Sequence, residues 1–367
     1  MVFSGGRSVV LPIILMAAAV SSEPVSAKTF AYVGNAGSNE IYVFSIDPKK
    51  GELTLIDKTA FPGIEKPGAS TPMAVSPDHR FLFAGVRSEP FTAVTFAIDG
   101  KTGKLKHVGN GPLADSMAYI SADRTGRFLL SASYGGNKVA VNPIGADGVV
   151  KPPQQVVPTG PNAHAILVDP SNHYAFASNL GSDTVLDFRF DGATGQLTPN
   201  DPHSIKVGEK SGPRHFIFHP NRKYVYLIHE LDGSVRVFDF DSATGALKQK
   251  QTVSSLPEGF KDKPWAADIH ITPNGRFLYT SERTSSTIKA FKVDPKDGTL
   301  TEGGSVPTET QPRGFAIDPT GHYLAATGEK SDGVTVYAID QSSGALTNLK
   351  SYKVGKSPNW VEFVSFR

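Results

Sequence analysis

Hydrophobic residues along this chain fall in short runs that alternate with polar residues. Residues 224–228 (Tyr-Val-Tyr-Leu-Ile) and 235–238 (Val-Arg-Val-Phe) are two examples, and clusters of Gly, Asp, Asn and Pro separate such runs. Short runs of this kind between turn-forming residues are typical of β-strands. No stretch of useful length shows the 3.6-residue hydrophobic period of an amphipathic helix. The pattern therefore predicts an all-β chain.

Two sequence markers recur along the chain, each of them seven times. A glycine in a Gly-x-Leu turn, or Gly-x-Val once, returns every 45 to 53 residues, and an aromatic residue that opens a strand returns every 46 to 53. The glycines are Gly51, Gly103, Gly148, Gly195, Gly245, Gly298 and Gly344. The aromatic residues are Phe30, Phe81, Phe128, Tyr174, Tyr224, Phe277 and Tyr323. Seven repeats of this length, each with four short strands, are typical of the blades of a β-propeller.

The first repeat is incomplete at its start, and the end of the chain supplies what it lacks. In the fifth repeat, residues 214–218 read as the innermost strand, and three further strands follow it. The first repeat has no such innermost strand, whereas residues 358–363 have its pattern. We therefore predict that residues 28–367 form one seven-bladed β-propeller with four-stranded antiparallel blades. The C-terminal strand is expected to complete the first blade, which closes the ring and removes an exposed edge.

Residues 1–27 have the pattern of a signal peptide. Arg7 precedes an apolar run over residues 9–20, and Val25-Ser26-Ala27 matches a signal-peptidase site. The run is too short for a permanent membrane helix, and no second hydrophobic span follows. We expect an exported protein, periplasmic or secreted, with no membrane span after processing.

Composition excludes several classes of function. Lys and Arg number 37 against 35 Asp and Glu, a balance that argues against a nucleic-acid partner. The chain has no cysteine, which rules out disulfides, thiolate metal sites and a cysteine nucleophile. Histidine motifs for metals, Gly-x-Ser-x-Gly and a Walker-type loop are missing from the sequence. We expect neither a metal nor another cofactor.

The repeat brings chemically active residues to one mouth of the central channel. Positions six residues before a turn proline and six residues after an opening aromatic lie at the same end of a blade. The charged residues and the histidine at these positions are Arg87, His164, Arg214, Glu230, Arg283, Arg313 and Glu329. Arginine offers a fixed fork for carboxylate or phosphate, and His and Glu can transfer protons. These residue types predict a site for a small anion with an acid/base pair. The alternative is that the residues are only hydrated, because the mouths of propellers are polar even where no ligand binds.

The remaining candidates carry weaker signals. Arg313 and Asn179 are predicted to contact the substrate at the mouth. His215 and His270 are expected to pack inside inner strands, and His219, before a turn proline, is expected at the opposite surface.

Three sequence strings give the chain a specific resemblance. Residues 212–215 (Gly-Pro-Arg-His), 265–273 (Trp-Ala-Ala-Asp-Ile-His-Ile-Thr-Pro) and 311–315 (Gln-Pro-Arg-Gly-Phe) resemble the seven-bladed bacterial 6-phosphogluconolactonases, a family that includes the fungal carboxy-muconate cyclases. The resemblance implies a metal-free activity on this fold. It also implies an active site made of His164, Arg214, Glu230 and Arg283.

The leading interpretation is a metal-independent lactonase that hydrolyses a small anionic sugar lactone. Arg214 and Arg283 would hold the anion and stabilise charge on the carbonyl oxygen. Either Glu230 or His164 would take the proton from water, and the sequence leaves that choice open. The alternatives are a carboxy-muconate-type cycloisomerase that uses the same residues and a non-catalytic extracytoplasmic binding propeller.

Overall fold

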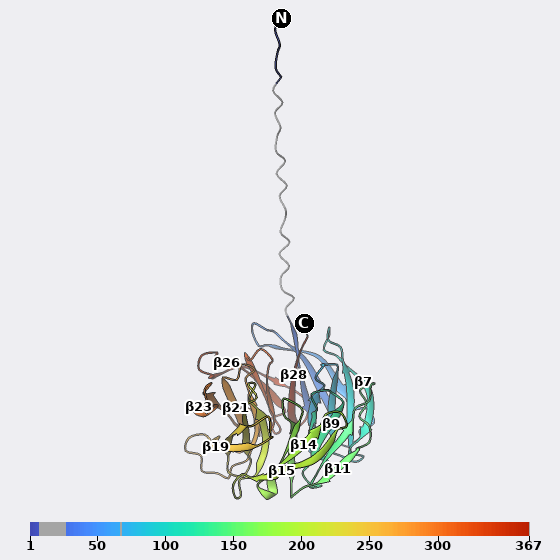
Figure 1. Cartoon of the computed structure of the whole chain (residues 1–367), viewed down its shortest axis with the longest axis vertical. Coiled ribbons are helices and arrows are strands. Elements are labelled where there is room, and N and C mark those ends of the chain that lie inside the picture. The colour runs from blue at the N-terminus through green and yellow to red at the C-terminus, as the bar shows by residue number, and fades with distance from the viewer. Residues whose placement is uncertain (7–26, 67, 367) are drawn as a thin grey trace.

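The computed structural model describes residues 1–6, 27–66 and 68–366. In this part of the chain, 28 strands form seven four-stranded sheets, and the only helical element described is a single 3₁₀ turn, η1 (Leu180–Ser182). Neighbouring strands within each sheet run antiparallel, as they do between β16 and β17. Figure 1 shows the sheets arranged around a common centre. The predicted seven-bladed propeller is confirmed, whereas residues 7–26 of the predicted signal peptide lie outside the described residues.

Each blade runs from an innermost to an outermost strand. The first three blades are β28 (Pro358–Phe366), β1 (Lys28–Asn35), β2 (Glu40–Ile46), β3 (Leu53–Ala60); β4 (Met73–Val75), β5 (Phe81–Val86), β6 (Thr92–Ile98), β7 (Leu105–Pro112); and β8 (Met117–Ala122), β9 (Phe128–Ser133), β10 (Lys138–Pro143), β11 (Gln155–Pro158). The other four are β12 (Ala163–Val168), β13 (Tyr174–Asn179), β14 (Thr184–Asp191), β15 (Gln196–Lys206); β16 (Pro213–Phe218), β17 (Tyr224–His229), β18 (Ser234–Phe240), β19 (Leu247–Ser254); β20 (Ala266–Ile271), β21 (Phe277–Glu282), β22 (Thr287–Val293), β23 (Leu300–Pro307); and β24 (Phe315–Ile317), β25 (Tyr323–Gly328), β26 (Gly333–Ile339), β27 (Leu346–Lys353).

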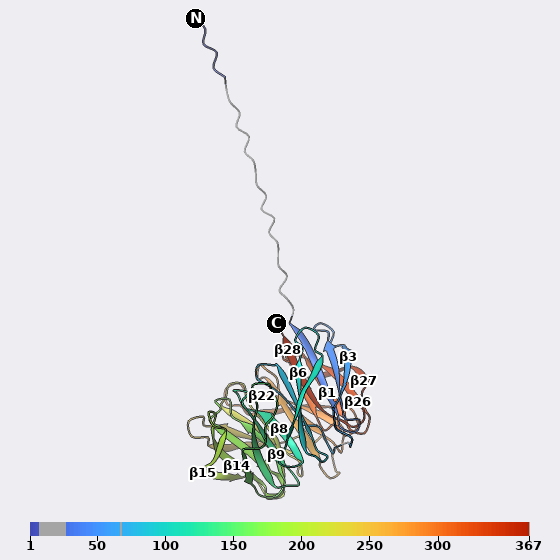
Figure 2. The same cartoon turned by 90° about the vertical axis from the view of Figure 1, so that its right-hand side faces the viewer.

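The two ends of the folded chain share the first blade. β28 pairs antiparallel with β1, so that Phe30 lies opposite Val364 and Tyr32 opposite Glu362. Figures 1 and 2 both show the red last strand beside the blue first strand. This pairing covers the edge that β1 would otherwise expose, and it confirms the predicted closure of the ring.

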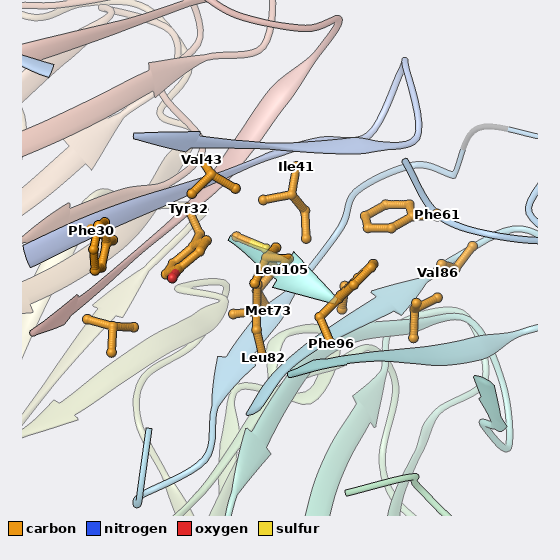
Figure 3. Close-up of a cluster of buried hydrophobic side chains, with 13 residues drawn as sticks. Phe30, Tyr32, Ile41, Val43, Phe61, Met73, Leu82, Val86, Phe96 and Leu105 are labelled. Carbon is orange, nitrogen blue, oxygen red and sulfur yellow. The ribbon is translucent and has the colours of Figure 1, made fainter. Parts of the chain in front are cut away.

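The hydrophobic core consists of seven clusters, one at each interface between neighbouring blades. Figure 3 shows the cluster between the first two blades, where Tyr32 and Val43 face Leu82 and Phe96. All four of these side chains are fully buried. Because every blade packs on two neighbours, the ring has no separate centre of hydrophobic packing. The axis is left free for polar groups.

The two sequence markers are the two halves of one contact between blades. Each turn glycine has a positive φ, and the opening aromatic ring of the preceding blade packs against it. At Gly148 (φ 83°), for example, a Cβ atom would lie 2.5 Å from the ring of Phe81. Only glycine tolerates both the left-handed backbone and this close approach. The repeat was readable from the sequence because this contact recurs around the ring.

One expectation about a histidine is wrong. His219 lies just after β16 and is 7% exposed rather than at the surface. Its Nε2 is 3.1 Å from the carbonyl oxygen of Gly275 in the next blade, and the ring packs on Tyr224 and Tyr226. The turn itself is exposed, but this side chain turns back into the interface between blades.

Candidate functional site

The inner strands carry irregularities where the site residues stand. The pairing of β12 with β13 shifts register between Ala163 and Ala165, and His164 lies within that shift. The pairing of β16 with β17 shifts between Pro213 and Phe216, around Arg214. A β-bulge bends the strand locally and redirects a side chain, and bulges are common beside active sites. These irregularities interrupt the strict alternation of faces along both strands.

A carboxylate between two guanidinium groups forms the centre of the site. Glu230 directly follows β17, and its Oε2 accepts hydrogen bonds from Nε of Arg214 at 3.0 Å and from Nη2 of Arg283 at 2.7 Å. Arg214 also donates through Nη1 to the carbonyl oxygen of Ala267. The Arg214 and Arg283 side chains are 1% and 4% exposed, and that of Glu230 is 12% exposed. Three of the four residues predicted as catalytic therefore form one hydrogen-bonded network.

Arg283 is held from several sides. It directly follows β21, and its guanidinium donates to the carbonyl oxygens of Trp265 at 3.0 Å and Ala266 at 3.2 Å. The same guanidinium lies 4.0 Å from the centre of the Trp265 ring, a cation–π contact. Trp265 itself is 40% exposed, so an aromatic surface borders the network on its solvent side.

The charges in this network fix the protonation of Glu230. Burial alone would raise the pKa of Glu230, but Arg283 and Arg214 outweigh it, and the pKa is lowered. Glu230 is therefore a carboxylate at neutral pH, and its proton affinity is weak. It balances and orients the two arginines better than it accepts a proton.

His164 lies beside this network without bonding to it. It is 4% exposed, and its ring makes edge contacts with Tyr134 and His215, with ring centres 5.7 and 5.1 Å away. Burial lowers the pKa of His164 well below its usual value, and the positive charges of Arg214 and Arg283 add to the effect. The imidazole is therefore neutral at pH 7, with one nitrogen able to accept a proton.

A second arginine pair lies at the same mouth. Nη1 of Arg313 donates to Glu329 at 3.1 Å, and Nη1 of Arg87 donates to the hydroxyl of Ser70 at 3.0 Å. Burial, with repulsion from Arg313 and Arg214, lowers the pKa of Arg87 to about 10. The repeat predicts that Arg87 lies at this mouth, but it does not single Arg87 out for binding. Its hydroxyl partners, Ser70 and Ser116, lie in loops between strands, where no repeated sequence pattern points to them.

The mouth carries an excess of positive charge. The four guanidiniums of Arg87, Arg214, Arg283 and Arg313 meet the two carboxylates of Glu230 and Glu329. Asp115, which also acts on Arg87, is itself paired with Lys138 at 2.8 Å. About two positive charges are left over in this group, a balance that favours a bound anion.

Asn179 stands apart from these charges. It ends β13, is fully buried, and donates through Nδ2 to the carbonyl oxygen of Gly160 at 2.6 Å. In this arrangement it supports the loop before β12. A substrate contact by Asn179 stays a prediction.

A partly open cavity lies on the axis, lined by the innermost strands of all seven blades. Its volume is about 310 Å³, and its polar lining includes His215, Asp268, His270 and Glu362. Nδ1 of His215 is 2.8 Å from Asp268, and Nε2 of His270 is 3.2 Å from the same carboxylate. His215 and His270 do lie within inner strands as expected, yet both are bound to a carboxylate that sequence reasoning had not singled out.

The described residues lack two kinds of feature, a cluster of metal ligands and a membrane-spanning helix. Residues 1–6, 27–66 and 68–366 contain no group of three or more His, Cys, Asp or Glu side chains placed to hold a metal ion. Within these same ranges, no helix is long and apolar enough to cross a membrane.

A family model, two curated sequences and a solved structure that resemble this chain carry the names of lactonases. Residues 30–363 match the family model described as lactonase, 7-bladed beta-propeller. A 6-phosphogluconolactonase of Pectobacterium carotovorum is 42% identical over 91% of this chain and 98% of its own, and one of Yersinia pestis is 42% identical over 91% and 97%. The structure of the periplasmic gluconolactonase of Pseudomonas aeruginosa superposes with a TM-score of 0.83 at 30% identity, over 92% of this chain and 99% of that one. The chain belongs to the family of seven-bladed β-propeller lactonases.

Proposed function

We propose that this protein is a metal-independent lactonase, similar to 6-phosphogluconolactonase, that hydrolyses an anionic sugar lactone at the mouth of the propeller. The observation that carries the proposal is a neutral, buried His164 beside guanidiniums with unmatched positive charge. The curated relatives named 6-phosphogluconolactonase support this class of substrate.

His164 is the better general base of the two candidates. Glu230 has a lowered pKa because it is bonded to two guanidiniums, and it holds a proton poorly. The pKa of His164 is also low, but the neutral imidazole is available at pH 7, and its Nε2, unlike its Nδ1, is not sealed from solvent. Positioned general bases contribute about 10²- to 10⁴-fold to rate.

The arginines supply the electrostatic part of the reaction. Arg214 uses two of its five N–H groups in the contacts described, and Arg283 uses three. The remaining donors can bind the carbonyl oxygen, which becomes negative when water adds to the lactone carbon. Arg87 and Arg313 can hold a phosphate or carboxylate elsewhere on the substrate.

We infer that the protein works outside the cytoplasm, in the turnover of sugar acids. The predicted signal peptide of residues 1–27 supports this location, and so does the name of the periplasmic gluconolactonase from Pseudomonas aeruginosa. The identity of the mature N-terminus tests it: sequencing protein from the native host should find Lys28 first, and a chain that begins at Met1 or Val2 would contradict export.

The activity is tested by following acid release at constant pH. Glucono-δ-lactone and its 6-phosphate serve as substrates, each with and without a chelator. Wild-type protein should hydrolyse at least one of them faster than buffer, with no change when chelator is added. His164→Ala should lose about 10²-fold or more in kcat.

An exposed histidine of the same blade serves as the control. His173 lies in the turn between β12 and β13, at the other end of the blade from His164, and His173→Ala should keep full activity. A fully active His164→Ala protein would remove His164 as the base. If neither lactone is hydrolysed, the cycloisomerase and the binding propeller become the leading alternatives.

A further inference from the structure

Two buried histidines touch each other just below the mouth. His164 on β12 and His215 on β16 are each 4% exposed, and their ring centres are 5.1 Å apart at an interplanar angle of 68°. Among the described residues, Nδ1 of His164 and Nε2 of His215 have no hydrogen-bond partner, and both atoms are sealed from solvent. A buried polar atom left unpaired costs about 1–3 kcal/mol, and here two such atoms stand on adjacent rings.

Asp268 determines which nitrogen of His215 carries the proton. Its carboxylate lies 2.8 Å from Nδ1 of His215, and it also faces His270 and two backbone N–H groups, those of Ile269 and Phe315. Burial would raise the pKa of Asp268, but His270 and His215 outweigh it, and the pKa is lowered. An ionised carboxylate only accepts hydrogen bonds, so Nδ1 of His215 must donate.

His215 therefore presents a lone pair at Nε2. Burial, aided by the charge of Arg214 and only partly opposed by Asp268, lowers the pKa of His215 to about 4. The ring is neutral at pH 7, and with the proton on Nδ1 its Nε2 is an acceptor. The rings of Tyr119 and His164 both pack against it, with ring centres 5.0 and 5.1 Å away, and the imidazole of His164 is also neutral and has one N–H to give.

We propose that His215, held by Asp268, is the positioning residue that fixes His164 as its Nδ1–H tautomer, so that Nε2 of His164 is the base toward the mouth. A small ring rotation lets Nδ1–H of His164 donate to Nε2 of His215, and this one bond satisfies both unpaired atoms. The arrangement follows the general logic in which a carboxylate orients one imidazole and thereby sets the tautomer that does the chemistry. The inference rests on the proposed function of His164.

In the hydrolysis this arrangement handles a single proton. An O–H bond of water breaks as its oxygen bonds to the lactone carbon, and the proton passes to Nε2 of His164. The tetrahedral intermediate then collapses, the bond from carbon to ring oxygen breaks, and the same proton moves to that oxygen. While His164 is protonated on both nitrogens, its Nδ1–H donates to His215, which stays neutral throughout.

The surroundings of the pair come from several blades. The charged and titratable groups that act on it are Tyr119, Tyr134, Arg214, Arg283, Arg313, Asp268 and His270. The arginines disfavour an imidazolium at His164 before substrate binds, and a bound anion reduces that effect.

Two substitutions of His215 separate its bond to Asp268 from its role as an acceptor toward His164. In His215→Asn the amide takes the place of Nδ1, so the bond to Asp268 can persist while the acceptor toward His164 is lost. In His215→Gln the amide oxygen takes the place of Nε2 and can still accept from His164. We expect His215→Asn to lose about 10- to 100-fold in kcat with little change in KM, the range typical of a group that orients a functional one, and His215→Gln to recover part of it.

A buried histidine outside the site is the matched control. His219, 7% exposed and directly after the same strand, is bound to a backbone carbonyl, so His219→Asn should lower stability without changing kcat. Equal loss of kcat in His215→Asn and His219→Asn would mean that the effect is on the fold, and it would overturn the proposal.

The tautomer itself is read by ¹⁵N NMR of histidine-labelled protein, with His164→Gln to assign the signals. Wild-type His164 should show a protonated Nδ1 and a bare Nε2, and His215→Asn should abolish this preference. An unchanged His164 spectrum, or full activity in His215→Asn, would overturn the inference. If wild-type protein opens no lactone yet shows this His215-dependent tautomer, the proposed function fails and the positioning of His164 stands.

Discussion

Replacement of Glu230 by glutamine tests how the site is held together. The substitution keeps the shape of the side chain and removes the charge that Arg214 and Arg283 share. Removal of one partner of a buried ion pair costs about 3–5 kcal/mol, because the remaining charge stays buried without compensation. The Glu230 side chain is 12% exposed and glutamine still offers one acceptor oxygen, so the lower end, about 3 kcal/mol, is expected.

The measurement is the free energy of unfolding from urea titration, extrapolated to zero urea. Asp239→Asn is the matched control, since Asp239 pairs with Lys250 at 3.0 Å but its side chain is 46% exposed. Exposed pairs contribute about 0–1 kcal/mol, and the control should stay within that range. If Glu230→Gln is no less stable than Asp239→Asn, the two guanidiniums do not depend on this carboxylate, and the reasoning about the network is wrong.

Added phosphate should restore part of the stability lost in Glu230→Gln, because an anion can replace the missing charge at the mouth. A variant that phosphate stabilises no more than it stabilises wild-type protein would contradict the charge balance described for this site.

Three further predictions follow from other parts of the molecule. Arg87→Gln should raise KM for the 6-phosphate of glucono-δ-lactone about tenfold or more and leave KM for the uncharged lactone nearly unchanged, since Arg87 has no carboxylate partner of its own among its described contacts. The pH profile of kcat/KM should stay flat from pH 8 to 6.5 and fall only at lower pH, because burial lowers the pKa of His164; a midpoint at 6.5 or above would contradict this. Burial raises the pKa of Glu362 from 4.5 to about 7, so its contribution to stability is present below pH 4.5 and lost as the pH rises through 7; Glu362→Gln should therefore be more stable than wild type by about 3 kcal/mol at pH 8 and equal to it at pH 4, as measured by urea unfolding.

Repetition made the architecture readable from the sequence. The turn glycines and opening aromatics recur because they touch in each neighbouring pair of blades, as at Gly148 and Phe81, and a contact used seven times leaves seven copies of its pattern. The missing innermost strand of the first repeat pointed to β28 for the same reason. Counting along the repeat also placed Arg214, Glu230 and Arg283 at one mouth, where they bond to one another.

Features that break the repeat could not be predicted from the sequence. The shift in register around Arg214 interrupts the alternation of faces, so strand parity could not show that His215 lies against His164. The bond between His215 and Asp268 joins two blades and occurs once, so no sequence pattern that recurs from blade to blade predicts it. The hydroxyl partner Ser70 of Arg87 comes from a connecting loop with its own sequence.

Closure of the ring by β28 places a demand on folding. Phe30 and Val364 lie opposite each other in this blade although they come from opposite ends of the folded part of the chain. Blades two to seven each consist of consecutive strands and can pair locally, whereas β1 stays unpaired on one side until β28 docks. During that interval its open edge can pair with another chain. The time that the two ends need to find each other therefore sets how long the unfinished molecule is exposed to misassembly.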